Sequence, residues 1–595
     1  MEAQKCILAG WSGADWELLN PLIDAGRMPC LARLVEEGSV GGLSGTGPLL
    51  PALQWSTIAT GCTADRHGVL ASTEPDPRSG GARPAGSASR RTKAIWNLLE
   101  ESGIRTHVAG WPASHPADPI RGVFVSDAFF RATAPYGLPW PIQPGSVHPA
   151  SVEERLLELR VHGGDFRGED LLTFVPRLRE IDQQQDRRVA QFAALLAECV
   201  TTHAAATWIL EQQRWDFLAV HYGAIGVARA LLRDGGEFYA SAVGAVCGFL
   251  DAMLARLVEL AGPAVRVVLV SPYGAAPNGL LCLSGPGFRR DELVFGASVL
   301  DVVPTILAGF GLPAGADMPG EVIRAAFETA EYPPRIPTWE TAPAAMAEHD
   351  LVAAGIRELA LLGYAGDVQP GVADLARRSE REARLNFALV QLEQGEPGKA
   401  AELLEELVAE FPREQALRSH FAYACLLAGR HAECRAACAA LQGDASAQLL
   451  LGALAMLEGN RAEALRRVRL AAAGTLTLPL RCLAGHAFLV LGLPEEAEPA
   501  FRDAIASAPG TAAAHHGMAR IRIGQGDFEA GAEAALTAIG IRFHSPPTHY
   551  LLGVALVGLG RFDRATQAFE TCLKLQPEMK AAEDWIAVLR QRAGA

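Results

Sequence analysis

Apolar and polar residues alternate in two different ways along the first 270 residues. Short apolar runs rich in β-branched residues predict buried strands at residues 5–9, 105–109, 217–222 and 265–270. Longer stretches with helical spacing lie between them and predict helices at residues 16–37 (a pair), 92–102, 152–159 and 184–213, and a further long helix within 223–260. This order is typical of a parallel sheet with helices on both faces. We therefore predict an α/β sandwich with a mostly parallel central sheet.

The C-terminal part follows a different pattern, in which pairs of helical stretches repeat. A glycine lies in the turn of each pair, and the steps between successive turn glycines are 34, 30, 33, 34 and 34 residues. A small residue follows each of these glycines by five positions, and prolines close three of the units. Small residues let two helices approach closely, and proline stops a helix. This period and these residues predict an all-α tetratricopeptide solenoid. The turn glycines are Gly395, Gly429, Gly459, Gly492, Gly526 and Gly560.

These patterns divide the chain into three parts. Residues 1–325 are expected to form one α/β domain, and residues 381–595 the tetratricopeptide domain. Residues 326–380 form the join, with an extended proline-rich linker at 332–337 and a helix at 351–362. The stretch 72–91 is rich in Gly, Pro, Ser and Arg, which predicts a mobile surface loop.

Composition narrows the classes of protein that fit. The chain has 595 residues, which suits two to four domains, and 49% hydrophobic residues, enough for sizeable cores. The net charge of -14 argues against a nucleic-acid partner. The 11 cysteines are scattered without zinc-like pairing, as in proteins of a reducing compartment. No apolar run approaches the roughly twenty residues of a membrane span. We expect a cytoplasmic protein with no membrane span.

Three of the predicted strands end in segments without strong metal ligands. The first strand runs into Ser12, the second into Gly223 and Val227, and the third into Pro272 and Tyr273. In open α/β sheets, ligands bind outside the carboxyl ends of the strands. Divalent metals bound there need carboxylate, imidazole or thiolate donors. The sequence therefore predicts a crevice without a metal centre.

Five segments of the first part have the form of motifs from one enzyme family. They are residues 10–16 (GWSGADW), 48–61 (PLLPALQWSTIATG), 65–69 (DRHGV), 284–287 (SGPG) and 301–307 (DVVPTIL). Together they resemble the alkaline phosphatase superfamily, in the branch of type I phosphodiesterases and nucleotide pyrophosphatases. In this resemblance, Ser56 falls on the position of the family's Thr or Ser nucleophile, and residues 65–69 match its His-Gly turn.

The resemblance implies a hydrolase that binds two divalent metals, typically zinc. The family holds them with an Asp, an Asp and His four residues apart, an Asp-His pair and a further His. The matching positions here are Ser12, Gly223 with Val227, Pro272 with Tyr273, and Ala276 or a deleted residue. Two dications need several anionic donors to offset their desolvation. We therefore expect degenerate metal positions and no bound cofactor.

The individual candidate residues also have structural interpretations. Ser56 could act as a nucleophile only with an activator such as a metal, and otherwise it would cap the start of a helix. Asp15 is expected to cap the helix that follows it, and Asp301 to cap or orient its own turn. By the resemblance, His67 is a structural hydrogen-bonding residue. Tyr273 is expected to fill the space of a metal and its water, because voids are costly.

Three functions remain open from the sequence. The first is a catalytically inactive phosphodiesterase-like pseudoenzyme whose repeats bind a protein or peptide in their groove. The second is a phosphate- or sulfate-ester hydrolase with an atypical site, and the third is a sensor of an anionic small molecule. Groove residues are expected on the first helix of each repeat, where ordinary helix packing is an equal alternative for the two tyrosines. The expected partner contacts are Asn386, Tyr423, His515 and Tyr550.

Overall fold

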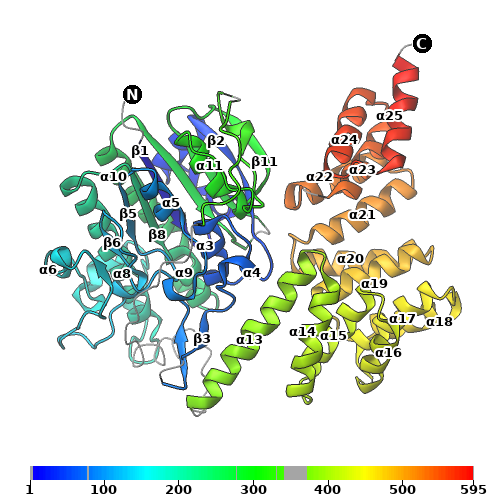
Figure 1. Cartoon of the computed structure of the whole chain (residues 1–595), viewed down its shortest axis with the longest axis horizontal. Helices are drawn as coiled ribbons and strands as arrows, with labels where there is room; N and C mark the ends of the chain where they lie inside the picture. The colour runs from blue at the N-terminus through cyan, green and yellow to red at the C-terminus, as the bar shows by residue number, and fades with distance from the viewer. Residues whose placement is uncertain are drawn as a thin grey trace. The chain divides into compact units, whose positions relative to one another are not determined.

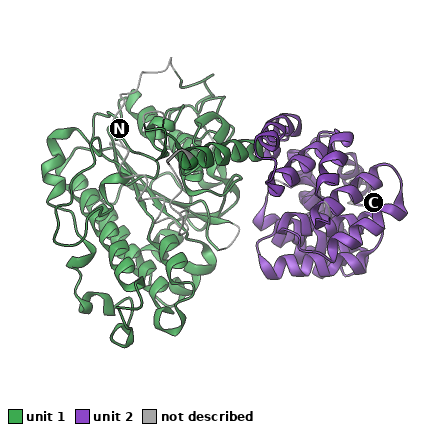
Figure 2. Cartoon of the chain, turned by 90° about the horizontal axis from the view of Figure 1, so that it is seen from below, with its two compact units in different colours: residues 1–390 green, residues 391–595 purple. Residues whose placement is uncertain are grey.

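The chain forms two compact units, Met1–Val390 and Gln391–Ala595 (Figure 2). The computed structural model describes residues 5–76, 79–275, 278–329, 331–340, 372–441, 443–543 and 545–593. The boundary between the units falls inside one helix, α13 (Val372–Glu393). The helix predicted at 351–362 lies outside the described residues.

A nine-stranded sheet forms the centre of the first unit (Figure 1). Its strand order is β11-β2-β10-β9-β1-β8-β5-β6-β7. The pairs β9–β1, β1–β8, β8–β5 and β5–β6 are parallel, and so is the pair β11–β2. Strand β10 runs antiparallel to its neighbours β9 and β2, and β7 runs antiparallel to β6. The predicted mostly parallel sheet is therefore confirmed. The strands are β1 Lys5–Trp11, β2 Gly38–Ser44, β5 Thr106–Ala109, β6 Phe124–Val125, β7 Val147–His148, β8 Phe217–Tyr222, β9 Val265–Ser271, β10 Gly279–Ser284 and β11 Glu292–Ser298.

Strand β1 illustrates why both faces of the sheet are covered. Ile7 and Ala9 belong to one apolar cluster, and Cys6 and Leu8 belong to the other, because successive side chains of a strand point to opposite faces. Helices α1, α2, α8, α9 and α10 pack on the first face, and α3, α5 and α11 on the second. The helices of this unit are α1 Trp16–Asp24, α2 Pro29–Glu36, α3 Pro51–Thr60, α4 Ala64–His67, α5 Ile95–Glu101, α6 Glu153–Leu157, α7 Gly168–Leu172, α8 Arg188–Gln212, α9 Ala224–Leu232, α10 Ala242–Ala261 and α11 Val302–Gly309.

Two helical stretches of this unit are long and apolar enough to cross a membrane, judged by length and composition alone. They are Arg188–Gln212 and Gly236–Ala261. The expectation that no stretch approaches this length is therefore wrong. Both stretches also supply side chains to the apolar cluster on one face of the sheet, among them Leu196 and Leu254, as core helices do.

Two predicted loops have more structure than expected. The stretch 72–91 contains a small antiparallel hairpin, β3 (Thr73–Pro75) with β4 (Ala82–Pro84). The proline-rich stretch 332–337 is extended, and it lies along the first unit, where Arg335 donates to the Gly315 carbonyl at 2.8 Å. Neither segment has the hydrophobic period of a longer element, so these pairings had no periodic signal in the sequence.

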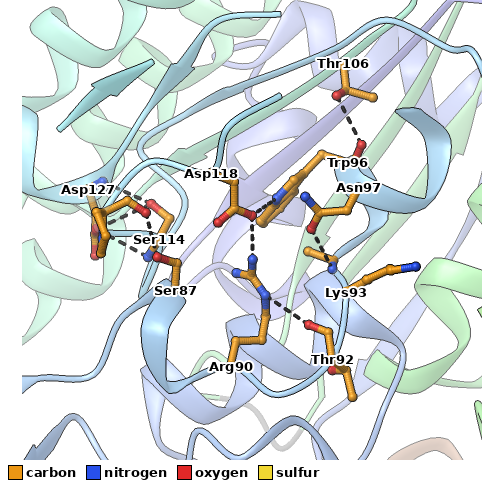
Figure 3. A network of polar contacts seen from close by, with 12 residues as sticks. Ser87, Arg90, Thr92, Lys93, Trp96, Asn97, Thr106, Ser114, Asp118 and Asp127 are labelled. Atoms are coloured by element: carbon orange, nitrogen blue, oxygen red, sulfur yellow. Dashed lines mark hydrogen bonds and ion pairs between the residues drawn. The ribbon is translucent and has the colours of Figure 1, made fainter. Parts of the chain in front are cut away.

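A buried polar network holds α5 against the loops beside it (Figure 3). Arg90 pairs with Asp118 at 2.5 Å, and the exposed fractions of the two side chains are 7% and 5%. Asp118 also accepts a hydrogen bond from the Trp96 indole of α5 at 2.7 Å. Removing one partner of such a pair would leave a buried charge, so the network fixes this region in one arrangement.

The second unit consists of paired helices. All six predicted turn glycines have positive φ angles, between 70° and 80°, a conformation that glycine adopts without steric cost. The first helices of successive pairs pack on one another: α15 on α17, α17 on α19, α19 on α21 and α21 on α23. The predicted all-helical repeat array is confirmed. Its helices are α14 Pro397–Glu410, α15 Gln415–Leu427, α16 His431–Ala440, α17 Ala445–Leu457, α18 Arg461–Ala472, α19 Leu478–Val490, α20 Pro494–Ser507, α21 Ala512–Gly524, α22 Phe528–Ile541, α23 Pro546–Gly558, α24 Phe562–Leu575 and α25 Lys580–Ala593.

Candidate functional site

The register of the sheet brings three strand ends to the same level. Strand β1 pairs in parallel with β8 on one side and with β9 on the other. Continuing both registers past the last paired residues places Ser12 beside Gly223 and Pro272. Ser12, Gly223 and Pro272 are therefore neighbours at the carboxyl edge of the sheet, where a ligand crevice is expected.

Ser12 is the centre of a closed group of side chains at this edge. Its hydroxyl lies 2.9 Å from His221 Nε2 and accepts a hydrogen bond from Trp55 Nε1 at 2.9 Å. Tyr273 lies close enough to Ser12 and Trp55 for their side chains to influence the pKa of its hydroxyl. The rings of Trp55 and His221 meet edge to face, with centroids 4.5 Å apart, and Trp111 packs behind Trp55 at 5.3 Å. We call Ser12, Trp55, His221 and Tyr273 the Ser12 cluster.

The Ser12 cluster is electrically neutral at physiological pH. Burial lowers the pKa of His221 to about 3, so its imidazole carries no charge. Burial also raises the pKa of Tyr273, and hydrogen bonds with Ser12 and Trp55 only partly oppose this effect. A neutral serine, histidine, tyrosine and tryptophan that bond to one another supply no anionic charge to a cation.

The carboxylate nearest in sequence, Asp15, is fully engaged elsewhere. Its side chain is 1% exposed and accepts from Leu18 N at 2.8 Å, which confirms the predicted cap of α1. Its other oxygen accepts from Arg229 Nη1 at 2.9 Å and from Ala275 N at 2.7 Å. Asp15 thus connects the start of α1, helix α9 and the segment after β9, and it is not directed at the Ser12 cluster.

The donor set at this edge does not fit two divalent metals. In the part of the chain that the structure describes, no three side chains of His, Cys, Asp or Glu gather in an arrangement that could hold a metal ion. A site for two dications needs several such donors, with hard anionic oxygens among them. Ala276, the remaining degenerate metal position, lies outside the described residues.

Ser56 does not cap a helix, which corrects the structural interpretation of this residue. Helix α3 begins at Pro51 with Leu50 as its N-cap, so Ser56 lies in the helix interior with 4% of its surface exposed. Proline is favoured at the first helical position, and it starts the helix six residues earlier than expected. The backbone of Ser56 is part of the helix, and its carbonyl accepts from Thr60 Oγ1 at 2.8 Å. Its amide therefore cannot serve as a helix N-terminus that attracts an anion.

Two apolar side chains near the expected crevice are exposed to solvent. Val227 lies in the first turn of α9, where its amide donates to Gly223 O at 3.2 Å, and it is 51% exposed. Leu49, before α3, is 57% exposed and lies against Gly45, as does the Pro272 carbonyl.

Two further residues have the structural roles that we predicted. His67 Nε2 lies 3.0 Å from Thr57 Oγ1, and its Nδ1 accepts from Val69 N at 3.1 Å, which joins α3 to the turn after α4. Asp301 accepts from Ser298 N at 2.8 Å and orients its own turn. Neither side chain contributes to the Ser12 cluster.

Asn386 is not a groove residue, which corrects its predicted role. It lies on the part of α13 that belongs to the first unit and is 6% exposed. Its Nδ2 donates to the Leu70 carbonyl at 2.8 Å. The repeat period placed this helix correctly, but its first turns pack on the α/β unit, and no local pattern indicates that.

The other expected partner contacts differ in how they are held. Tyr423 on α15 is partly buried, which raises the pKa of its hydroxyl. His515 Nε2 lies 2.7 Å from the Pro509 carbonyl. Tyr550 packs on the ring of Phe569 with centroids 5.7 Å apart, as expected for ordinary helix packing.

Comparison with known proteins separates the two parts of the chain. Residues 7–281 match the family model of type I phosphodiesterase / nucleotide pyrophosphatase. Tetratricopeptide repeat models match residues 385–449, 482–543 and 546–579. No curated protein gives a significant match.

Similar solved structures concern the repeats. The APC/C hetero-tetramer Cut9–Hcn1 is 16% identical, with a TM-score of 0.32, over 39% of this chain and 46% of that chain. YrrB, a TPR protein with an unusual peptide-binding site, is 17% identical with a TM-score of 0.25, over 31% of this chain and 97% of YrrB. The second TPR domain of human RPAP3 in complex with an HSP70 peptide is 22% identical with a TM-score of 0.18, over 19% of this chain and 98% of the RPAP3 domain. The chain thus spans less than half of the length of the first of these.

Proposed function

Because the chain joins a type I phosphodiesterase / nucleotide pyrophosphatase domain to tetratricopeptide repeats, we propose that it is a catalytically inactive member of that enzyme family which acts as a protein-interaction scaffold. In this proposal the α/β unit keeps its fold but not its chemistry, and the repeats bind a partner protein. Solenoid repeats suit this role since they present an extended surface to a peptide or helix.

The Ser12 cluster is the observation that carries the proposal. Where the family binds metals, the Ser12 hydroxyl bonds to Trp55 and His221, so it already has polar partners. A metal would have to break these bonds and would gain no anionic donor in return. A metal is the activator that Ser56 would need, and the described residues offer no group of three His, Cys, Asp or Glu side chains to hold one.

Metal content and hydrolysis together test the loss of catalysis. The purified full chain is incubated with zinc or manganese, desalted and measured by elemental analysis, and its hydrolysis of bis(4-nitrophenyl) phosphate is followed. We expect no stoichiometric metal and a rate that the Ser56→Ala variant leaves unchanged. About two metals per chain, with hydrolysis that Ser56→Ala abolishes, would refute the proposal and favour the hydrolase.

Affinity capture from native extract tests the scaffold role with the full chain. The double variant Leu457→Asp/Val490→Asp changes two repeat side chains that are 65% and 64% exposed, so the fold should tolerate it. We expect partners to be lost with this variant and kept with Leu49→Asp, a matched change at the crevice mouth. The opposite result would make the crevice the recognition site and favour the sensor.

We also propose that the protein is cytoplasmic. All 11 cysteines are free and buried, as is common where thiols stay reduced.

A further inference from the structure

The two edges of the central sheet differ in how they are protected. An edge strand presents unpaired amide and carbonyl groups, and proteins usually keep such a strand short or place proline or charge on it. One edge strand, β7, has only two residues and is followed by Pro149. The other edge strand, β11, has seven residues, and its stretch 293–298 (LVFGAS) contains neither a charged residue nor proline (Figure 1). The sheet can therefore be extended at β11 but not at β7.

Two large apolar side chains of β11 are exposed on the same face of the sheet. Leu293 is 61% exposed and Phe295 is 65% exposed. Val294 lies between them and points to the opposite face, where it belongs to a buried apolar cluster. Residues two apart in a strand share a face, so Leu293 and Phe295 form one apolar patch at the edge.

The backbone groups of the same two residues face outward from the sheet. The Val294 carbonyl points toward β2, since a Cβ added to Gly41 of β2 would lie 2.1 Å from its oxygen. Backbone groups alternate in direction along a strand, so those of Leu293 and Phe295 point away from β2. No described strand pairs with β11 on that side. A bulge follows Val294 in the pairing with β2, which confines any further pairing to the part of β11 up to Phe295.

This edge is complementary to itself when two copies meet in antiparallel orientation. If a two-fold axis passes beside Val294, Leu293 of each copy lies opposite the partner's Phe295. Opposite residues whose backbone groups face each other exchange both of their N–H···O bonds. Their side chains also lie on the same face and in contact, so the four exposed apolar side chains form one cluster. A single register thus satisfies both the open backbone groups and the apolar patch.

The charges beside β11 favour the same arrangement. Arg290, which precedes the strand, is exposed and makes no ion pair with a described residue. In the two-fold pair it lies opposite the partner's Ser298, whose amide donates to the Asp301 carboxylate at 2.8 Å. Each copy therefore brings a positive charge toward a negative one, whereas a parallel pair would place Arg290 beside the partner's Arg290. The two acidic residues that follow Arg290 lie opposite uncharged residues, so like charges do not meet.

We propose that two copies of the chain pair antiparallel through β11 and form one continuous sheet across a two-fold axis beside Val294. This inference goes beyond the scaffold function and does not depend on it. The contact is confined to the edge strand and its flanks, so the interface is small, and we expect a dimer that forms at micromolar concentration.

Sedimentation velocity of the full chain tests the oligomeric state. Over concentrations from about 1 to 100 µM we expect a monomer–dimer equilibrium. Phe295→Lys should raise the dissociation constant of the dimer at least about tenfold, because it places a charge in the apolar cluster on both copies. Leu138→Lys is the matched control, since this leucine is 60% exposed but lies outside β11, and the equilibrium should not change. Both changed side chains are exposed, so circular dichroism of the two variants should match that of the unchanged chain.

Cysteine cross-linking tests the register. The single variants Leu293→Cys and Phe295→Cys are oxidised separately and as an equimolar mixture. The native cysteines are free and buried, so the introduced thiols react first. We expect the mixture to form at least about threefold more disulfide-linked dimer than either variant alone, because opposite residues of such a pair are close enough for a disulfide.

Several results would overturn the inference. One is a chain that stays monomeric over the whole concentration range, and another is a dimer that Phe295→Lys leaves unchanged. A single cysteine variant that cross-links as well as the mixture would contradict the antiparallel register. If the chain is a monomer but Phe295→Lys loses partners in capture from native extract, the edge binds another protein, and a second copy is the wrong occupant.

Discussion

Replacing Asp15 with alanine is expected to destabilise the first unit by about 4 kcal/mol. The cap bond to Leu18 contributes about 1 kcal/mol. The bond from the Ala275 amide to a charged oxygen contributes about 2 kcal/mol. The pair with Arg229 adds about 1 kcal/mol, a low value because the Arg229 side chain is 28% exposed and screened by water.

Two further variants separate these contributions. Asp15→Asn keeps an oxygen that can cap α1 but removes the charge, so it should cost about 2 kcal/mol. Arg229→Ala removes only the partly exposed pair and should cost about 1 kcal/mol. Urea unfolding followed by tryptophan fluorescence reports on the first unit, since nine of the ten tryptophans precede residue 340. Circular dichroism at 222 nm follows the helical second unit alongside it.

The reasoning is refuted if the free energy of unfolding of Asp15→Ala lies within about 0.5 kcal/mol of that of the unchanged chain. It is also refuted if Asp15→Asn costs as much as Asp15→Ala, because the cap would then contribute nothing.

Two more predictions concern pH and packing. Burial lowers the pKa of His67 to about 3. The unfolded chain therefore takes up a proton at this histidine near pH 6.5, whereas the folded chain does not. The contribution of His67 to the free energy of unfolding is fully present above pH 6.5 and is lost as the pH drops toward 3. His67→Gln should therefore flatten the profile of unfolding free energy by roughly 1.4 kcal/mol per pH unit between pH 6 and 4, and an unchanged slope would contradict this assignment. Gly517→Ala should destabilise the second unit by about 1–3 kcal/mol, because its Cβ would lie 2.2 Å from the Phe501 ring. Gly524→Ala on the same helix is the control, because the added Cβ meets no atom within 4 Å. The transition temperature of the second unit in calorimetry should then rise or stay unchanged.

The repeat array could be predicted almost completely from the sequence, because its signal is local. Each turn needs one residue in the left-handed conformation, and glycine meets this need at a constant spacing from Gly395 to Gly560. The central strands could be predicted for a similar reason. A short apolar run predicts the strand, and the glycine or proline that follows the run predicts where the strand ends at the carboxyl edge of the sheet.

The contents of the crevice could be predicted only in part. The absence of acidic side chains at Ser12, Gly223 and Pro272 can be read from the sequence, but the hydrogen bonds formed at this edge join residues far apart in the chain. Ser12 is 43 residues from Trp55 and 209 residues from His221. Trp55 directly precedes Ser56, the residue that falls on the family's nucleophile position in the resemblance. This neighbourhood was the one sign in the sequence that Trp55 lies at the site. The start of α3 had a local sign as well, in proline at its first position.

The shared helix α13 links the stabilities of the two units. Its early part is held in the first unit, where Ser379 Oγ lies 2.7 Å from Thr73 Oγ1, and its last residues belong to the second. Repeat arrays fold by coupling between neighbours and need a cap at each end. Here contacts within the α/β unit hold the early turns of the helix that also begins the first repeat. Unfolding of the α/β unit would release these turns, so α13 is expected to lose its early helical turns in the same transition.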